Sequence, residues 1–175
     1  MKVSIALILI CASLGALGVL AGQESADDWK SGSVSYKLKE SGGSSGTISY
    51  QTTVSVSSGI MVVSARKRTD WANESQLEKP HDIHEIDDVI TVALRDIDPG
   101  NFGVTKDTSG TPTFWEVHVN SARKNAVRSV SKRDGKDSTS KDGETFIIRY
   151  DNADMAMKAV EEIRVLARQA ALPKK

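Results

Sequence analysis

The sequence predicts a mainly β domain that ends in a single α-helix. Apolar and polar residues alternate with a period of two between about residues 32 and 68 and again between about 113 and 151, which is typical of half-buried antiparallel strands. Between about 153 and 170 the apolar residues follow helical spacing instead. We therefore expect an antiparallel β-sandwich or partly open barrel of about seven strands, capped by the C-terminal helix.

The N-terminal segment has the pattern of an export signal. Lys2 precedes an uncharged, apolar run from Val3–Leu20, and the small residues Ala21 and Gly22 follow it. This is the charged start, apolar middle and small-residue end of a secretory signal peptide. We therefore expect residues 1–22 to be removed and the protein to be exported, to the periplasm or the medium. The alternative is an uncleaved N-terminal helix that tethers the protein to a membrane, because the run approaches the ~18–20 residues that span a bilayer.

Cysteine chemistry is not expected in the mature protein. Cys11 is the only cysteine of the chain and lies inside the predicted signal peptide. Acylation of this cysteine, as in a lipoprotein, needs a small residue before it, and Ile10 fills that position. The mature chain would therefore have no disulfide, thiol nucleophile or cysteine-based zinc site, and an ordinary apolar core must stabilise it.

The charge balance does not indicate a nucleic-acid-binding protein. Lys and Arg together number 23, as do Asp and Glu, so the formal net charge is zero. Acidic residues are concentrated between Asp70 and Asp98, and basic residues between Ser121 and Tyr150. We expect neighbouring strands or loops to carry this complementary charge, and a basic ligand-binding face is the alternative.

The alternating segments define the strands expected in the domain, which covers residues 32–171 and follows a flexible leader at 23–31. Strands are expected at about 32–40, 48–56, 60–68, 90–94, 113–120, 126–132 and 144–151. Residues 82–98 also fit helical spacing or two short extended pieces. Asp96–Gly100 predicts a turn, and the polar segment 134–143 predicts a mobile loop.

The C-terminal helix is expected to dock on the sheet through one apolar stripe. Asp151 or Asn152 can cap its first turn, and Pro173 ends it. The stripe consists of Ala156, Ala159, Val160, Ile163, Leu166, Ala167 and Ala170. Helical propensity alone leaves such a helix marginal in water, so burial of this stripe must stabilise it.

Three segments carry a family resemblance: Gly46–Val62, Asp82–Val89 and Phe146–Ala153, the last of which runs from a strand into the final helix. With the order of seven strands and one helix, they resemble a pleckstrin-homology-like (PH-like) domain of the bacterial or GRAM type, over about residues 30–171. The resemblance implies a binding or scaffolding module without catalytic residues, and some relatives hold phosphoinositides or peptides. The phosphoinositide role is not carried over, because the expected first loop, Ser41–Gly46, contains no basic residue.

Three motifs that could carry chemistry have simpler structural interpretations. Gly42–Gly46 fits the nucleophile-elbow pattern, but it joins two strands instead of a strand and a helix. His81–Glu85 offers two histidines and carboxylates to a metal, with His118 as the third histidine, but its spacing is not that of a zinc hydrolase. Asp96–Asn101 begins like a calcium loop until Pro99 interrupts it, so we interpret it as a turn.

Two tryptophans and one glycosylation sequence are the remaining candidates. Trp71 and Trp115 could stack on a ligand, but Trp115 shares its face with Val117 and Val119, which predicts packing in the core. Asn73–Ser75 would accept a glycan in a eukaryotic secretory pathway.

No catalytic, cofactor-binding or metal-binding residue is assigned. We expect an exported, non-catalytic PH-like binding module whose partner is a protein, contacted through residues 66–82 or 121–143, with no nucleic acid, no cofactor and no stable membrane insertion after cleavage. The alternative is a small-ligand carrier, or an enzyme whose site is built from scattered strand residues. A pocket lined by convergent polar groups would favour the alternative, and a filled interior with an exposed apolar patch would favour the module.

Overall fold

The computed structural model describes residues 27–39, 45–72 and 81–173. The predicted signal peptide and residues 23–26 of the predicted leader lie outside the described residues. The elements are η1 (Asp28–Lys30), β1 (Ser31–Lys39), β2 (Ser45–Ser57), β3 (Ile60–Ala72), β4 (His81–Ala93), η2 (Leu94–Asp96), β5 (Ile97–Asp107), β6 (Phe114–Ser121), β7 (Val127–Arg133), β8 (Lys136–Gly143), β9 (Thr145–Tyr150) and α1 (Ala153–Ala171).

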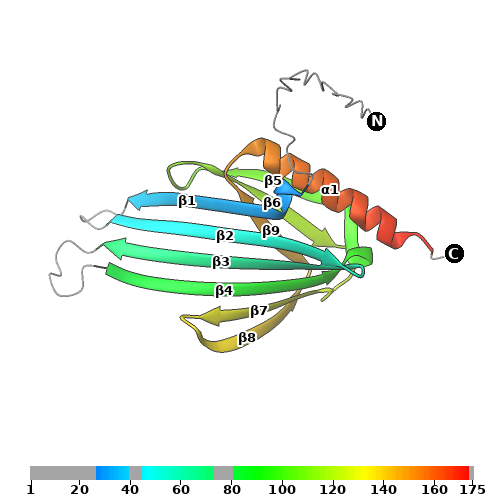
Figure 1. The fold of residues 1–175 in the computed structure, drawn as a ribbon, viewed down its shortest axis with the longest axis horizontal. Coiled ribbons are helices and arrows are strands. Elements are labelled where there is room, and N and C mark those ends of the chain that lie inside the picture. Colours follow the sequence, from blue (N-terminus) through cyan, green and yellow to red (C-terminus); the bar gives the residue numbers. More distant parts are fainter. Residues whose placement is uncertain (1–26, 40–44, 73–80, 174–175) are drawn as a thin grey trace, which may run out of the picture.

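The strands form two antiparallel sheets, and α1 lies along the smaller one (Figure 1). The larger sheet has six strands in the order β1-β2-β3-β4-β7-β8, and the smaller has three in the order β5-β6-β9. Within the described residues the sheets do not close into a barrel. The predicted fold class, a mainly β partly open sandwich capped by a C-terminal helix, is therefore confirmed.

The structure has nine strands where the sequence predicted about seven. The first addition is β5, because the predicted turn at Asp96–Gly100 is wrong: the chain bends in η2 and then continues directly as a strand. The pairing of β5 with β6 is irregular between Ile97 and Phe102, so Pro99 and Gly100 lie where a regular ladder is interrupted. Proline therefore marks an irregular strand here and not a loop.

The second addition is β8, which replaces the predicted mobile loop at 134–143. This segment pairs with β7 over its length, and the turn between them is the two residues Asp134 and Gly135, with φ of 49° and 70°. Such positive values are those of a tight hairpin turn, for which an Asp-Gly pair is well suited. The segment contains no apolar residue, so the sequence has no alternation of apolar and polar residues that would predict this strand.

The ambiguous segment 82–98 resolves into one long strand followed by η2. β4 pairs with β3 on one side and with β7 on the other, which brings the acidic segment next to the basic one, as predicted. Its acidic side chains also pair with β3, where Arg66 binds Asp87 at 2.7 Å and Arg68 approaches Glu85 at 3.5 Å.

The main core lies where α1 meets both sheets. Val117, Ile148 and Ile163 are completely buried in it, together with Met61 and Val63 from β3. Strand β9 contributes its alternate residues Phe146, Ile148 and Tyr150. The predicted helical stripe is thus confirmed, with Ala156, Ala159, Val160, Ile163 and Ala167 buried.

The start of the domain differs from the predicted flexible leader. Trp29 is only 2% exposed, and the Tyr150 hydroxyl donates a hydrogen bond of 2.6 Å to its carbonyl oxygen. Lys158 of α1 pairs with Asp28 at 2.7 Å. Residues 27–31 therefore belong to the folded domain, held by the helix and by the end of β9.

Candidate functional site

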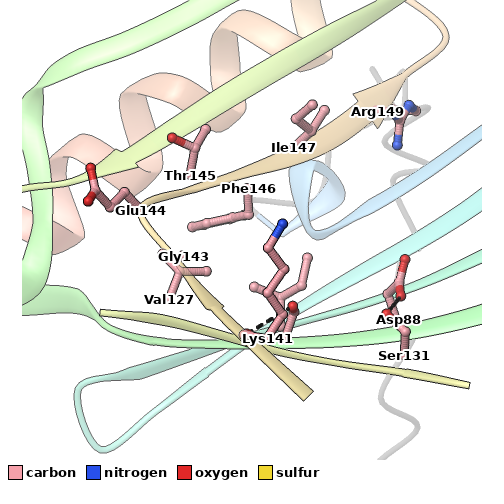
Figure 2. Close-up of a pocket in the computed structure, with 12 residues that line it drawn as sticks. Asp88, Val127, Ser131, Lys141, Gly143, Glu144, Thr145, Phe146, Ile147 and Arg149 are labelled. Atoms are coloured by element: carbon pink, nitrogen blue, oxygen red, sulfur yellow. Dashed lines mark hydrogen bonds between the residues drawn. The ribbon is translucent and has the colours of Figure 1, made fainter. Parts of the chain in front are cut away.

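The candidate site is a cleft of about 510 Å³ between the two sheets (Figure 2). We call it the inter-sheet cleft. Its walls come from β4, β7 and β8 of the larger sheet and from β9 of the smaller one. The lining residues are Asp88, Ile90, Val127, Ser129, Ser131, Lys141, Gly143, Glu144, Thr145, Phe146, Ile147 and Arg149.

Strand periodicity explains how polar groups reach the space between the sheets. On β9, Phe146 and Ile148 point into the main core, so the intervening Ile147 and Arg149 face the other side. Arg149 is accordingly half-buried in the cleft, and not exposed on an outer surface.

The larger sheet changes from apolar to polar along the cleft. In the paired strands, Val127 lies opposite the buried Val92, Ser129 opposite Ile90 and Ser131 opposite Asp88. Since residues two apart on a strand share a face, Ser129 and Ser131 lie on the same face of β7 as the buried Val127, and this face offers hydroxyl groups in place of apolar side chains. The cleft therefore has an apolar end and a polar end.

The polar end is held by short contacts between neighbouring strands. The Ser131 hydroxyl donates a short hydrogen bond to the Asp88 carboxylate. The Ser129 hydroxyl donates to the Lys141 carbonyl oxygen at 3.1 Å, which fixes β8 against β7. Figure 2 shows the Lys141 side chain rising from β8 across the cleft toward Phe146. Within the described part of the chain, no carboxylate forms an ion pair with Lys141.

Arg149 is fixed by two different contacts. Its Nε and Nη2 atoms each lie 2.9 Å from Oε1 of Glu116 on β6. The guanidinium also lies 4.2 Å from the ring centroid of Tyr50 on β2, a cation–π contact between the sheets. Its charge is therefore largely balanced by Glu116, and its position is set before any ligand arrives.

An aromatic cluster lies behind Arg149. Tyr36 stacks on Phe114 with centroids 5.0 Å apart, and Tyr50 lies 6.3 Å from Tyr36. Burial, reinforced by the neighbouring Tyr50, raises the pKa of Tyr36 far above that of a free tyrosine. Tyr36 is neutral at physiological pH, as a free tyrosine also is, and the raised pKa keeps it neutral at higher pH.

The histidines of the predicted metal candidate do not converge. The structure does not describe the His81 side chain, and His118 lies on the smaller sheet, 3.1 Å from the Thr105 hydroxyl. His84 lies between two carboxylates, 3.3 Å from Asp82 and 3.2 Å from Asp134. No group of three or more potential ligands suited to a metal ion occurs among the described residues.

His84 instead fastens the β7–β8 hairpin to β4. Asp134, in the hairpin turn, accepts a hydrogen bond of 2.8 Å from the Glu85 amide as well as facing the imidazole. The hydrogen bond to Asp134, with a second carboxylate nearby, raises the pKa of His84. Lys141 of the cleft lies on the same hairpin, so the contacts of Asp134 with His84 and Glu85 help to hold β8, and with it Lys141, in position.

The other sequence candidates have structural roles or lie outside the described residues. Trp115 packs against the main core, as predicted. The Asp98 carboxylate accepts the Gly100 amide at 2.9 Å, and Asp96 pairs with Arg123 at 3.3 Å, so neither is presented to calcium. The central serine of the elbow pattern and the glycosylation sequence lie outside the described residues.

A second, more open hollow of about 590 Å³ lies between β1, β2 and the start of α1. Two of its polar groups already have protein partners. The Asn152 side chain caps the helix by accepting the Met155 amide at 2.8 Å, and the Tyr150 hydroxyl bonds to the Trp29 carbonyl. It is a weaker candidate than the inter-sheet cleft.

The sequence assigned no individual residue of the inter-sheet cleft to a site, although Ser129, Ser131 and Lys141 lie within the segment 121–143 that was named as a possible contact region. Asp88 and Arg149 were counted only as members of charged segments, and Lys141 fell in a predicted loop. One sequence pattern could have indicated the site. On β9, Arg149 lies on the strand face opposite the core residues Phe146, Ile148 and Tyr150. Which strand faces it across the sandwich depends on sheet order, and sequence periodicity carries no information about that order.

Comparisons with family models, with curated proteins and with solved structures found no match for this chain. In the described part of the chain, no helix combines the length and apolar character needed to cross a bilayer.

Proposed function

We propose that this protein is an exported, non-catalytic binding module of PH-like fold that holds a small ligand in the inter-sheet cleft. The supporting observation is the cleft itself. Its volume of about 510 Å³ is in the range of small-molecule sites, and hydroxyl, carboxylate and cationic groups from four strands converge on it among aliphatic and aromatic side chains. This is the polar, convergent pocket that favours a ligand carrier over a filled scaffold.

A binding role fits the cleft better than a catalytic one. Its two β7 hydroxyls are engaged, Ser129 with a backbone carbonyl and Ser131 with Asp88. Activation of a serine nucleophile needs a base to take its proton and an oriented partner for that base. No imidazole lines the described cleft, and among the described residues the Lys141 ammonium makes no hydrogen bond with either hydroxyl.

The order of elements supports the PH-like part of the proposal. A four-stranded meander, β1 to β4, precedes the three-stranded sheet, and β9 passes into α1 with two residues between them. The β7–β8 hairpin belongs to the larger sheet, although in the sequence it lies between β6 and β9 of the smaller sheet. This similarity is one of fold alone, so the binding role depends on the cleft.

Export is the second part of the proposal, and it has a direct test. The full chain would be expressed with its own N-terminal segment, and the protein recovered outside the cytoplasm would be measured by intact mass. A mass that begins near residue 22 is expected. A protein retained in the membrane fraction with residues 1–22 intact would contradict cleavage and favour a tethering helix.

The cleft proposal is tested by filling the cleft. Ser129→Phe places an aromatic ring among the lining residues, and Ser140→Phe makes the same change on β8, on the opposite face of the larger sheet. Small molecules that co-purify with the exported protein would be measured by native mass spectrometry. We expect them with wild type and Ser140→Phe and not with Ser129→Phe. Equal occupancy of both variants would refute the cleft as the site.

A protein partner is a second candidate, because part of one outer sheet face is apolar. Ile60 and Val89 are 39% and 44% exposed on the outer face of the larger sheet, where Val62 and Val130 also lie. Exposed apolar groups on one sheet face are typical of protein contacts. If crosslinking from the envelope captures a partner, Val89→Lys should abolish capture, whereas Ser129→Phe should not.

A further inference from the structure

We infer that the ligand of the inter-sheet cleft is an amphipathic molecule with an anionic head group, which the Lys141 ammonium binds. This inference rests on the proposed function, since it names the ligand class for the same cleft. Its support is the arrangement of apolar side chains in the cleft and a lysine ammonium that forms no ion pair among the described residues.

The apolar end of the cleft can hold a hydrocarbon chain. Ile90, Val127, Phe146 and Ile147 contribute side chains from three strands of the two sheets, and Val127 and Phe146 also belong to the main core. A hydrocarbon chain bound here would contact apolar side chains that adjoin the main core, and it would not cover polar groups. Burial of hydrocarbon contributes about 0.8 kcal/mol per methylene group, so a short chain would suffice for measurable affinity.

Besides Lys141, the charged lining residues are Arg149, which is already paired, and the two carboxylates Asp88 and Glu144. Glu116 balances Arg149 through two contacts of 2.9 Å. The Asp88 carboxylate accepts the Ser131 hydroxyl and lies beside it at the polar end of the cleft, on the side away from Glu144 in Figure 2. Glu144 lies exposed at the margin, away from Arg149 in Figure 2.

Lys141 is the remaining cation of the described cleft, and its side chain is exposed to solvent. Its side chain extends from an edge strand into the cleft, and its ammonium has no carboxylate partner among the described residues. An ammonium beside an apolar wall gains from an anion that stays within hydrogen-bond reach. A ligand whose chain lies along Phe146 and Val127 would bring its head group to this ammonium.

The test uses three probes of equal chain length: octanoate, 1-octanol and octylammonium. Each would be titrated, below its aggregation limit, into the ¹⁵N-labelled full chain as exported, with the Ser129, Ser131 and Thr145 amides as reporters. Octanoate is expected to bind about threefold to tenfold more tightly than octanol, as a partly solvated ion pair allows. Octylammonium is expected to bind more weakly than either.

Lys141→Gln and Lys132→Gln form a matched pair, because Lys132 lies on the outer face of β7. The preference for octanoate over octanol should disappear in Lys141→Gln and persist in Lys132→Gln, with octanol affinity unchanged in both. Equal binding of the three probes, tighter octylammonium binding, or a preference that survives Lys141→Gln would overturn the anionic ligand class while leaving the cleft as a binding site. Absence of any shift at the cleft amides would overturn the cleft proposal as well.

Discussion

Replacing Ile163 by aspartate tests whether the C-terminal helix is part of the domain's core. Ile163 is completely buried where α1 packs on the smaller sheet, and it belongs to the same apolar cluster as Val117 and Ile148. The change removes the Cγ1, Cγ2 and Cδ1 carbons of isoleucine and places a carboxyl group, which has no partner there, in a close-packed interior.

The magnitude follows from two additive losses. Truncating a buried isoleucine to a small side chain costs about 2–5 kcal/mol, because the cavity does not fully collapse. Burying an unpaired carboxyl group costs several kcal/mol more, whether it ionises or stays protonated. Their sum, roughly 5 kcal/mol or more, equals or exceeds the lower end of the 5–15 kcal/mol that stabilises a typical domain.

The assay is thermal unfolding of the exported protein, followed by circular dichroism at a strand-sensitive wavelength. Ile163→Asp is expected to abolish the cooperative transition. Val165→Asp is the control, because Val165 lies on the same helix but is 45% exposed, and it should shift the midpoint by only a few degrees. A melt of Ile163→Asp that matches wild type would refute the packing argument.

Three further perturbations test local features. A hydrogen bond to Asp134 raises the pKa of His84 in the folded protein. The stability that the protonated His84 contributes is therefore complete below its unfolded pKa of about 6.5 and is lost as the pH rises through its folded pKa. His84→Gln should remove this pH dependence from the midpoints of urea unfolding. Asn152→Ala should lower the free energy of unfolding by about 1 kcal/mol, since it removes the helix cap. Gly46→Ala would place a Cβ atom 2.3 Å from the Trp71 ring, so it should shift tryptophan emission and destabilise by roughly 1–3 kcal/mol.

The helix and the long alternating strands were predictable because each carries its own periodic signal. The stripe around Ile163 and the cap at Asn152 are local patterns, and local patterns are what spacing records. The strands near β1, β2, β3, β6, β7 and β9 were found for the same reason. Propensity and tertiary packing agree in these elements.

The missed strands are those in which the usual signals are absent or misleading. β8 reads Lys-Asp-Ser-Thr-Ser-Lys-Asp-Gly, and an edge strand exposed to water needs no apolar face. β5 contains Pro99 and Gly100, which normally mark turns, but here they occupy an irregular stretch of an edge strand. Tertiary pairing overrides local chemistry in both segments.

The inter-sheet cleft was not predictable because it is a property of sheet order. Arg149 and Lys141 come from different sheets, and the strands that carry them are not paired with each other. Their meeting depends on β7 and β8 joining the far edge of the larger sheet, beyond β4. A single sequence gives the face on which each residue lies, but not the strand that faces it.

The account is tested most directly by a crystal structure of the protein isolated under mild conditions from the compartment where it resides. It predicts continuous ligand density in the inter-sheet cleft, with an apolar portion along Phe146 and Val127 and a polar end near the Lys141 ammonium. A cleft that contains only water, while a bound partner covers Val62 and Val89 on the outer face, would contradict it.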